Sequence, residues 1–188
     1  MTNSLDGKSA SRWHIVTRRG SEVMITNSPG GKSADRVLVV PAGFALYEYL
    51  RYSVYICQPH RFFQQCARMA FYTDNKIDRH IPRILGKIEA ISGNEIETRT
   101  DISETERALL RAVLKKMQPA RSEEWSKHQL KVVFLTPPDS PETLVLPRDI
   151  ENNLSSSTRR RIAFTQNQRY VTLSSLQKAR YTSGLVDY

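Results

Sequence analysis

A Gly-Lys-Ser tripeptide occurs twice near the start of the chain and is the residue set with the most recognisable chemistry. It lies within segments 2–12 (TNSLDGKSASR) and 26–36 (TNSPGGKSADR), which match at eight of eleven positions with an offset of 24. Gly-Lys-Ser ends the phosphate-binding loop GxxxxGK[ST], in which backbone amides and the lysine hold nucleotide phosphates. The repeat therefore raises the question of a nucleotide hydrolase.

The residues around each copy argue against that chemistry. Thr2 and Thr26 occupy the place of the first loop glycine. The loop must also lie between a strand and a helix, yet the second copy is followed by VLVV, which is typical of a strand. We expect no nucleotide hydrolysis. The repeat is best explained as a local duplication tolerated in surface loops, although a pair of anion-binding loops stays open.

Other catalytic and metal-binding patterns are weak. The four histidines are well separated and none belongs to HExxH or HxH, and no GxSxG is present. Cys57 and Cys66 form no CxxC pair, which favours buried thiols in a reducing cytoplasm. No apolar run is long enough to span a membrane. We predict no catalytic residues, no cofactor and no metal site.

Two nuclease patterns remain as alternatives. Asp74-Asn75-Lys76 has the D-x-K spacing of magnesium-dependent nucleases, but it falls in an expected turn. Arg121 and His128 have the spacing of a metal-independent ribonuclease motif and resemble the R-x(4–6)-H element of HEPN-type enzymes, which are helical bundles. Nuclease activity therefore stays open as an alternative to a binding function.

Positive charge is concentrated in two blocks. The chain carries 28 basic and 19 acidic residues, a net charge of +9. Residues 51–88 hold seven basic and two acidic groups, and residues 155–188 hold six and one, so each block contributes +5. The region between them is close to neutral. Such asymmetry favours a polyanionic partner, most often nucleic acid.

Aromatic residues alternate with the cations in both blocks. Cationic side chains bind phosphates and aromatic faces stack on unpaired bases. Trp125 is a further stacking candidate by residue type. The nucleic-acid-binding residues predicted from this pattern are Arg61, Arg68, Tyr72, Lys76, Arg79, Arg83, Arg159, Arg160, Arg161, Arg169, Tyr170, Lys178 and Arg180.

Most of the expected elements are short strands. Residues 1–12 have no periodicity and are expected to be a flexible tail, and residues 13–188 a single domain. A short helix is expected before the strand YSVYICQ, and RMAFYTDNKI has a hairpin signature. Further strands are expected after Pro82 and in QLKVVFLT, TLVLP, RRRIAFTQ and RYVTL. A last short helix is expected after a Ser174 or Ser175 cap.

The clearest helix covers residues 103–117. Ser103 and Glu106 form a capping box, leucines and valine recur at helical spacing, and Pro119 is expected to stop the run. The pattern as a whole predicts an α+β fold with a small, strongly bent mixed sheet, one firm helix and one or two short helices. The apolar face of helix 103–117 could alternatively bind a protein partner, as in a scaffold subunit.

The stretches ARMAFYTDNKIDRHIPRILGKIEAI and LKVVFLTPPDSPETLVLP are similar to PUA-like modules, including the EVE and ASCH groups. The similarity covers residues 50–185 and consists of an aromatic strand, a turn, an I-P-x-I step and late hairpins. It implies a small β-barrel with a pocket for nucleic acid, sometimes for a modified or flipped-out base. The expected function is therefore a nucleic-acid-binding module with a basic, aromatic-lined cleft.

Overall fold

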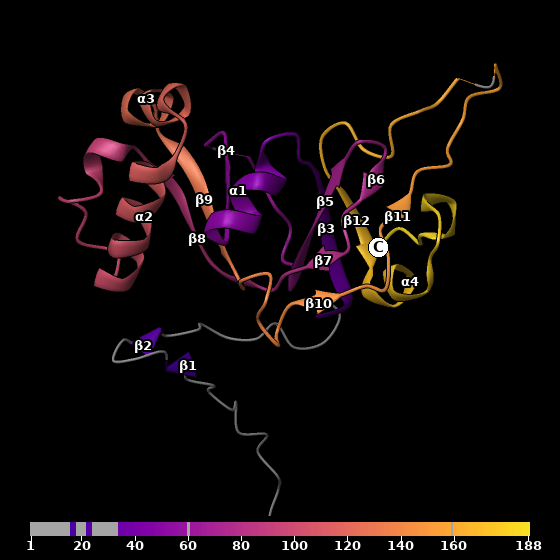
Figure 1. Ribbon diagram of the computed structural model, residues 1–188, viewed down its shortest axis with the longest axis horizontal. Coiled ribbons are helices and arrows are strands. Elements are labelled where there is room, and N and C mark those ends of the chain that lie inside the picture. Colours follow the sequence, from indigo (N-terminus) through magenta and orange to yellow (C-terminus); the bar gives the residue numbers. More distant parts are fainter. Residues whose placement is uncertain (1–15, 18–21, 24–33, 60, 159) are drawn as a thin grey trace, which may run out of the picture.

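The computed structural model describes residues 16–17, 22–23, 34–59, 61–158 and 160–188. The expected tail 1–12, both Gly-Lys-Ser tripeptides and Arg159 lie outside these residues. The described chain is α+β, as the sequence predicts, with a curled mixed sheet, a smaller antiparallel sheet and short helices (Figure 1). None of the described helices has the length and apolar character needed to cross a bilayer.

The larger sheet is mixed. Its strands, in order across the sheet, are β11 (Ile150–Glu151), β6 (Lys76–Ile77), β5 (Arg68–Thr73), β3 (Arg36–Pro41) and β12 (Arg169–Thr172). β3 and β5 run parallel, and the other pairs are antiparallel. The centres of β3 and β5 are buried, because their apolar runs pack on both faces of the sheet. One face contacts α4 and the C-terminal loops, and the other faces α1.

The hairpin expected in RMAFYTDNKI is confirmed as β5–β6. Asp74 and Asn75 form its two-residue turn with φ angles of 49° and 60°. Left-handed conformations at both turn positions match the twist of antiparallel strands, and Asp and Asn tolerate them well.

The smaller sheet places β9 (Leu130–Leu135) between β4 (Val54–Cys57) and β8 (Ile84–Ile91). β8 begins after Pro82, as expected. Every residue of β9 is buried, because helices cover one face and the central core covers the other. Two minor antiparallel pairs complete the strands: β1 (Val16–Thr17) with β2 (Glu22–Val23), and β7 (His80–Ile81) with β10 (Leu144–Val145).

Helix α1 (Ala45–Tyr52) lies at the junction of the two sheets. Its buried Tyr49 ring stacks on Phe71 of β5, with centroids 4.9 Å apart and an interplanar angle of 17°. The helix ends at Ser53, whose left-handed φ of 58° turns the chain directly into β4. The central core therefore fixes α1 against both sheets, with Phe44 and Tyr47 on its other side.

The capping box predicted for residues 103–117 is confirmed in α2 (Glu104–Lys116). The Ser103 hydroxyl accepts from the Glu106 amide, and the Glu106 carboxylate accepts from the Ser103 amide at 2.8 Å. Leu110 and Val113 are buried against the smaller sheet. The apolar face expected to contact a protein partner is therefore covered within the chain.

Helix α2 ends before Pro119, as the sequence predicts, but helical structure resumes at once. Pro119 is the first residue of α3 (Pro119–Lys127), where its fixed φ suits the helix and its missing N–H costs nothing. Trp125 of α3 is completely buried, and its indole N–H donates to the Ile91 carbonyl at 2.8 Å. This anchor explains why a weakly amphipathic segment forms a helix.

The C-terminal region departs from expectation in detail. Thr172 caps α4 (Leu173–Lys178), in place of Ser174 or Ser175. RRRIAFTQ forms no strand in its described part beyond an isolated bridge between Ser155 and Arg161.

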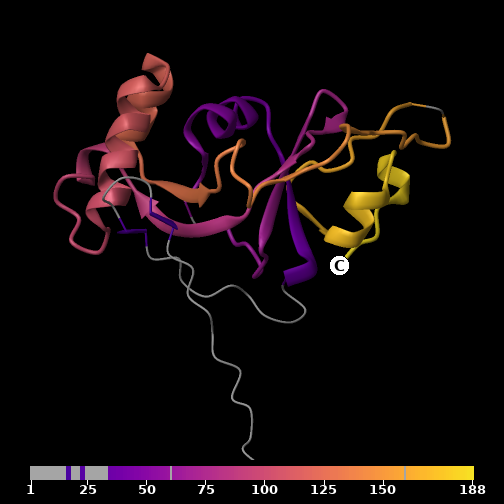
Figure 2. The ribbon, with the colours of Figure 1, turned by 60° about the horizontal axis from the view of Figure 1, so that its bottom comes forward.

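The 3₁₀ turns are η2 (Gly93–Glu95) and η3 (Thr182–Gly184). Figures 1 and 2 show α2 and α3 at one end of the molecule and α4 at the other.

Candidate functional site

A cavity of about 520 Å³ opens between α1, β4 and the connection from α2 to α3. Tyr52 of α1 fixes one side of it, because its hydroxyl donates to the Lys116 carbonyl at 2.6 Å. Arg121 of α3 fixes another by donating to the Ile56 carbonyl at 3.2 Å. The walls thus come from segments far apart in the chain, which are held together by hydrogen bonds.

Two aromatic rings at the cavity are exposed to solvent. Phe44, immediately before α1, is 78% exposed, and Tyr47, one turn later, is 51% exposed. Residues spaced by three lie on one helical face, so both rings are on the side of α1 opposite the core residue Tyr49. Large exposed rings beside a cavity are unusual for side chains with only a packing role.

Of the three cations that line the cavity, Arg61 and Lys116 lie apart from Arg121 of the inner wall. Neither forms an ion pair with a carboxylate of the described chain. One Arg61 nitrogen donates to the Tyr55 hydroxyl at 3.1 Å, and the other donates to the Asn167 carbonyl. We call Phe44, Tyr47, Arg61 and Lys116 the lip of the cavity.

The two basic blocks meet beside this lip. In addition to the Arg61–Asn167 bond, Gln168 donates to the Phe62 carbonyl at 3.0 Å, and the Gln64 amide donates to the Tyr170 hydroxyl at 2.9 Å. Segments 61–64 and 167–170 are therefore adjacent although each bonded pair is 106 residues apart. Among the predicted cations that the structure describes, only Arg61 lines the cavity.

Several predicted cations are engaged within the fold. Lys76 pairs with Asp149 at 2.7 Å, Arg169 pairs with Asp187 through two hydrogen bonds of 2.6 and 2.8 Å, and Arg83 lies 3.5 Å from Glu142. Arg68 donates to the carbonyls of Ile81 and Glu142, and burial lowers the pKa of its guanidinium. These four side chains have structural partners and are poorly placed to bind phosphate.

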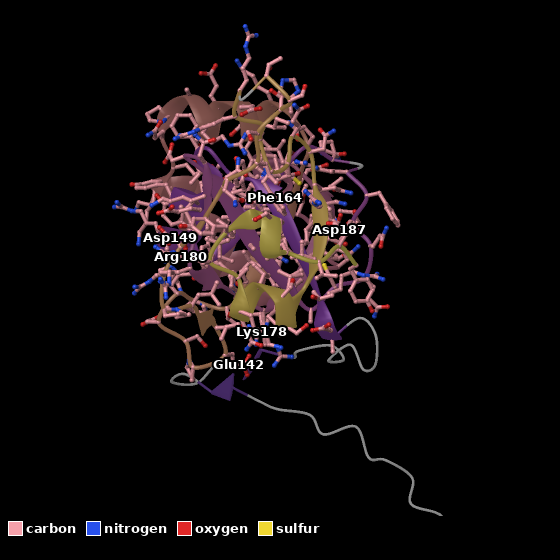
Figure 3. All side chains as sticks on the ribbon, turned by 90° about the vertical axis from the view of Figure 1, so that its right-hand side faces the viewer. Glu142, Asp149, Phe164, Lys178, Arg180 and Asp187 are labelled. Atoms are coloured by element: carbon pink, nitrogen blue, oxygen red, sulfur yellow. The ribbon has the colours of Figure 1, made fainter. Side chains whose placement is uncertain are left out.

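The remaining predicted cations are exposed but do not surround the cavity. Within the described residues no carboxylate pairs with Arg79, Arg160, Arg161 or Lys178, and Arg180 lies over the Tyr181 ring at 5.4 Å. Figure 3 shows Lys178 and Arg180 around α4, at the end of the molecule opposite α3. They line a second, more open depression of about 580 Å³ with Ser174 and Thr172.

The aromatic residues named from the sequence are mostly buried. Tyr72 is 7% exposed, packs against Phe164 and accepts a hydrogen bond from Asn152 at 2.9 Å. Trp125 is a core residue, as described above. Tyr170 is half-buried, and burial raises the pKa of its hydroxyl, which accepts from the Gln64 amide. None of the three presents a free ring to a base.

An ion cluster forms the inner wall of the cavity. Arg121 donates to Glu48 at 3.2 Å and to Glu124 at 2.7 Å. Glu48 is only 6% exposed, and desolvation raises its pKa although the nearby Arg121 charge opposes that rise. Arg121 thus stabilises two carboxylates and is not free to contact a scissile phosphate.

The nuclease patterns gain no geometric support. Arg121 and His128 lie near opposite ends of α3, which spans 119–127. Asp74 and Asn75 form the hairpin turn. Across the described parts of the chain, no three histidine, cysteine, aspartate or glutamate residues cluster in a way that could hold a metal ion.

Both cysteines are free thiols, and burial raises the pKa of each to about 11. Because the thiolate is the reactive form, about one thiol in a thousand is ionised at pH 8. We expect native protein at pH 8 to react with iodoacetamide on the order of a hundredfold more slowly than the denatured chain. The native rate should rise about tenfold per pH unit up to pH 10.

Mass spectrometry of timed samples measures these alkylation rates. Equal rates for the native and denatured chains would contradict the burial of both thiols.

Four residues of the cavity were not predicted from the sequence: Phe44, Tyr47, Glu48 and Lys116. For Phe44, Tyr47 and Glu48 the signal lay in FALYEYLR, where these residues share a helical face opposite Tyr49. Lys116 lies outside that segment. Aromatic residues in a short apolar segment resemble core residues. Only the packing of α1 distinguishes the exposed rings of Phe44 and Tyr47 from the buried ring of Tyr49.

Comparison with known proteins finds no matching family model, no matching curated protein and no matching solved structure.

Proposed function

We propose that the protein is a non-enzymatic nucleic-acid-binding module whose cavity takes up an unstacked base of a single strand. The observation that supports this most directly is the lip, where two exposed aromatic rings lie beside two cations that have no carboxylate partner in the described part of the chain. Phe44 and Tyr47 would stack on the base, and Arg61 and Lys116 would contact the flanking phosphates. Two free thiols with raised pKa values suit a reducing compartment, and a cytoplasmic location is part of this proposal.

The dimensions of the cavity agree with this role. Its volume of about 520 Å³ falls within the range of small-ligand sites, roughly 300–1,000 Å³. A nucleobase is flat and apolar on its faces with polar edges, which matches aromatic rings at the opening and polar groups at the wall. The resemblance to PUA-like modules is part of this hypothesis, because those modules bind nucleic acid through such a pocket.

The salt dependence of binding tests this proposal. We expect a fluorescein-labelled single-stranded RNA of about ten nucleotides to bind with an affinity that falls as salt rises, by about 0.7 logarithmic units per phosphate contacted. Arg61→Gln and Lys116→Gln should each reduce that slope by about 0.7. Fluorescence anisotropy at several salt concentrations measures both quantities, with a single-stranded DNA of the same sequence for comparison.

Lys178→Gln is the matched control, since it removes an exposed cation at the opposite end of the molecule. Its slope should equal that of the unaltered protein. A flat salt dependence, or a greater loss from Lys178→Gln than from Arg61→Gln, would overturn the proposal.

A further inference from the structure

Glu48 offers a hydrogen-bond acceptor to the cavity. Its side chain comes from the α1 face that carries Tyr47, and it lines the cavity although it is almost fully buried. One carboxylate oxygen accepts from Arg121 at 3.2 Å. No other hydrogen bond joins this carboxylate to a described residue, and Glu48 is one of the residues that line the cavity.

The charge of this carboxylate is only partly compensated. The Arg121 guanidinium is divided between Glu48, Glu124 and the Ile56 carbonyl. An ionised carboxylate accepts hydrogen bonds and donates none. A ligand that enters past the lip would therefore meet Glu48, whose carboxylate favours N–H donors of the ligand and disfavours its hydrogen-bond acceptor atoms.

On the premise that the cavity takes up an unstacked base, we propose that it selects guanine, with Glu48 accepting from the base edge. Guanine presents two adjacent donors, the ring N1–H and the N2 amino group, which match the two oxygens of one carboxylate. Adenine and cytosine each place an amino donor beside an unprotonated ring nitrogen. Uracil places one N–H between two carbonyl oxygens. Each of these three bases would therefore bring the lone pair of an acceptor atom close to the carboxylate.

The positions of the charges around the cavity also favour entry of the base ahead of the phosphates. Phosphates are attracted to Arg61 and Lys116 at the lip and repelled by Glu48 within. A nucleotide therefore enters base first, and its Watson–Crick edge reaches the inner wall. A carboxylate has about four lone-pair sites, and Arg121 uses one of them, so sites remain for the two guanine donors.

Four labelled heptanucleotides, UUUXUUU with X as guanine, adenine, cytosine or inosine, test this assignment. We expect guanine to bind about tenfold more tightly than adenine or cytosine, because a matched bidentate contact discriminates by that order. Inosine, which keeps N1–H and lacks the N2 amino group, should lie between them. Dissociation constants are measured by anisotropy at one fixed salt concentration.

Glu48→Gln preserves the size of the side chain and replaces one acceptor with a donor. It should reduce the guanine preference to about twofold or less and leave the salt slope unchanged. Glu123→Gln removes an exposed carboxylate from α3 that lies outside the cavity lining, and this variant should keep the preference. The base series on the unaltered protein needs no variant, so the test holds even if Glu48→Gln fails to fold.

The outcomes separate the two proposals. Binding with equal affinity for all four bases, or a guanine preference retained by Glu48→Gln, overturns the role of Glu48 and leaves the nucleic-acid-binding function standing. Absence of salt-dependent binding to any of the four strands overturns both.

Discussion

The double variant Phe44→Ala/Tyr47→Ala is expected to bind single-stranded RNA about 10- to 100-fold more weakly than the unaltered protein. Stacking of a base on an aromatic side chain contributes about 1–3 kcal/mol, and the two rings share one base. Both rings are largely exposed, so their removal should change the free energy of unfolding by about 0.5 kcal/mol or less. Anisotropy titrations and urea unfolding measure the two quantities on the same samples.

Two controls make this result specific. Phe44→Tyr keeps a stacking ring and should bind within about twofold of the unaltered protein. Leu50→Ala removes an exposed apolar side chain from the same helix, outside the cavity lining, and should have no effect on binding. If the double variant binds RNA as tightly as the unaltered protein, the aromatic rings have no stacking role.

The Trp125→Ala variant is expected to lose about 3–5 kcal/mol of unfolding free energy, as is typical when a buried tryptophan is truncated. Trp125 is 0% exposed, packs between α2, α3 and the smaller sheet, and satisfies the Ile91 carbonyl. Urea denaturation followed by circular dichroism measures the loss. In Trp125→Phe most of the packing remains, but the hydrogen bond to Ile91 is lost, so the loss should be about 1–3 kcal/mol.

This prediction separates the structural role of Trp125 from the stacking role suggested by its residue type. A stacking residue would lower RNA affinity on truncation without lowering stability. If Trp125→Ala retains its unfolding free energy and binds RNA weakly, the assignment of Trp125 to the core is wrong.

The elements that were predicted correctly have strong local causes. The capping box of α2, the Asp74-Asn75 turn and the β-branched runs of β3 and β9 each restrict the backbone through neighbouring residues. α3 was not predicted because proline breaks a helix at an interior position but favours a helix at its first position, where Pro119 lies. Its anchor, the Trp125–Ile91 hydrogen bond, joins residues 34 apart and leaves no local pattern.

The candidate site was harder to predict for the same reason. Charge and composition indicated Arg61, which lines the cavity, but they did not show that segments 61–64 and 167–170 are hydrogen-bonded to each other. The partners of Lys76 and Arg169 are Asp149 and Asp187, which lie 73 and 18 residues away in the chain. No spacing rule shows that these cations are neutralised.

A ¹⁵N NMR titration with a short single-stranded RNA tests the central claim most directly, since it locates the contact on the protein. We expect the largest amide shift changes in residues 43–48, 55–61 and 116–121, the segments that form the cavity and its lip. Changes concentrated in residues 172–186 around α4, or no changes with saturating RNA, would contradict the account.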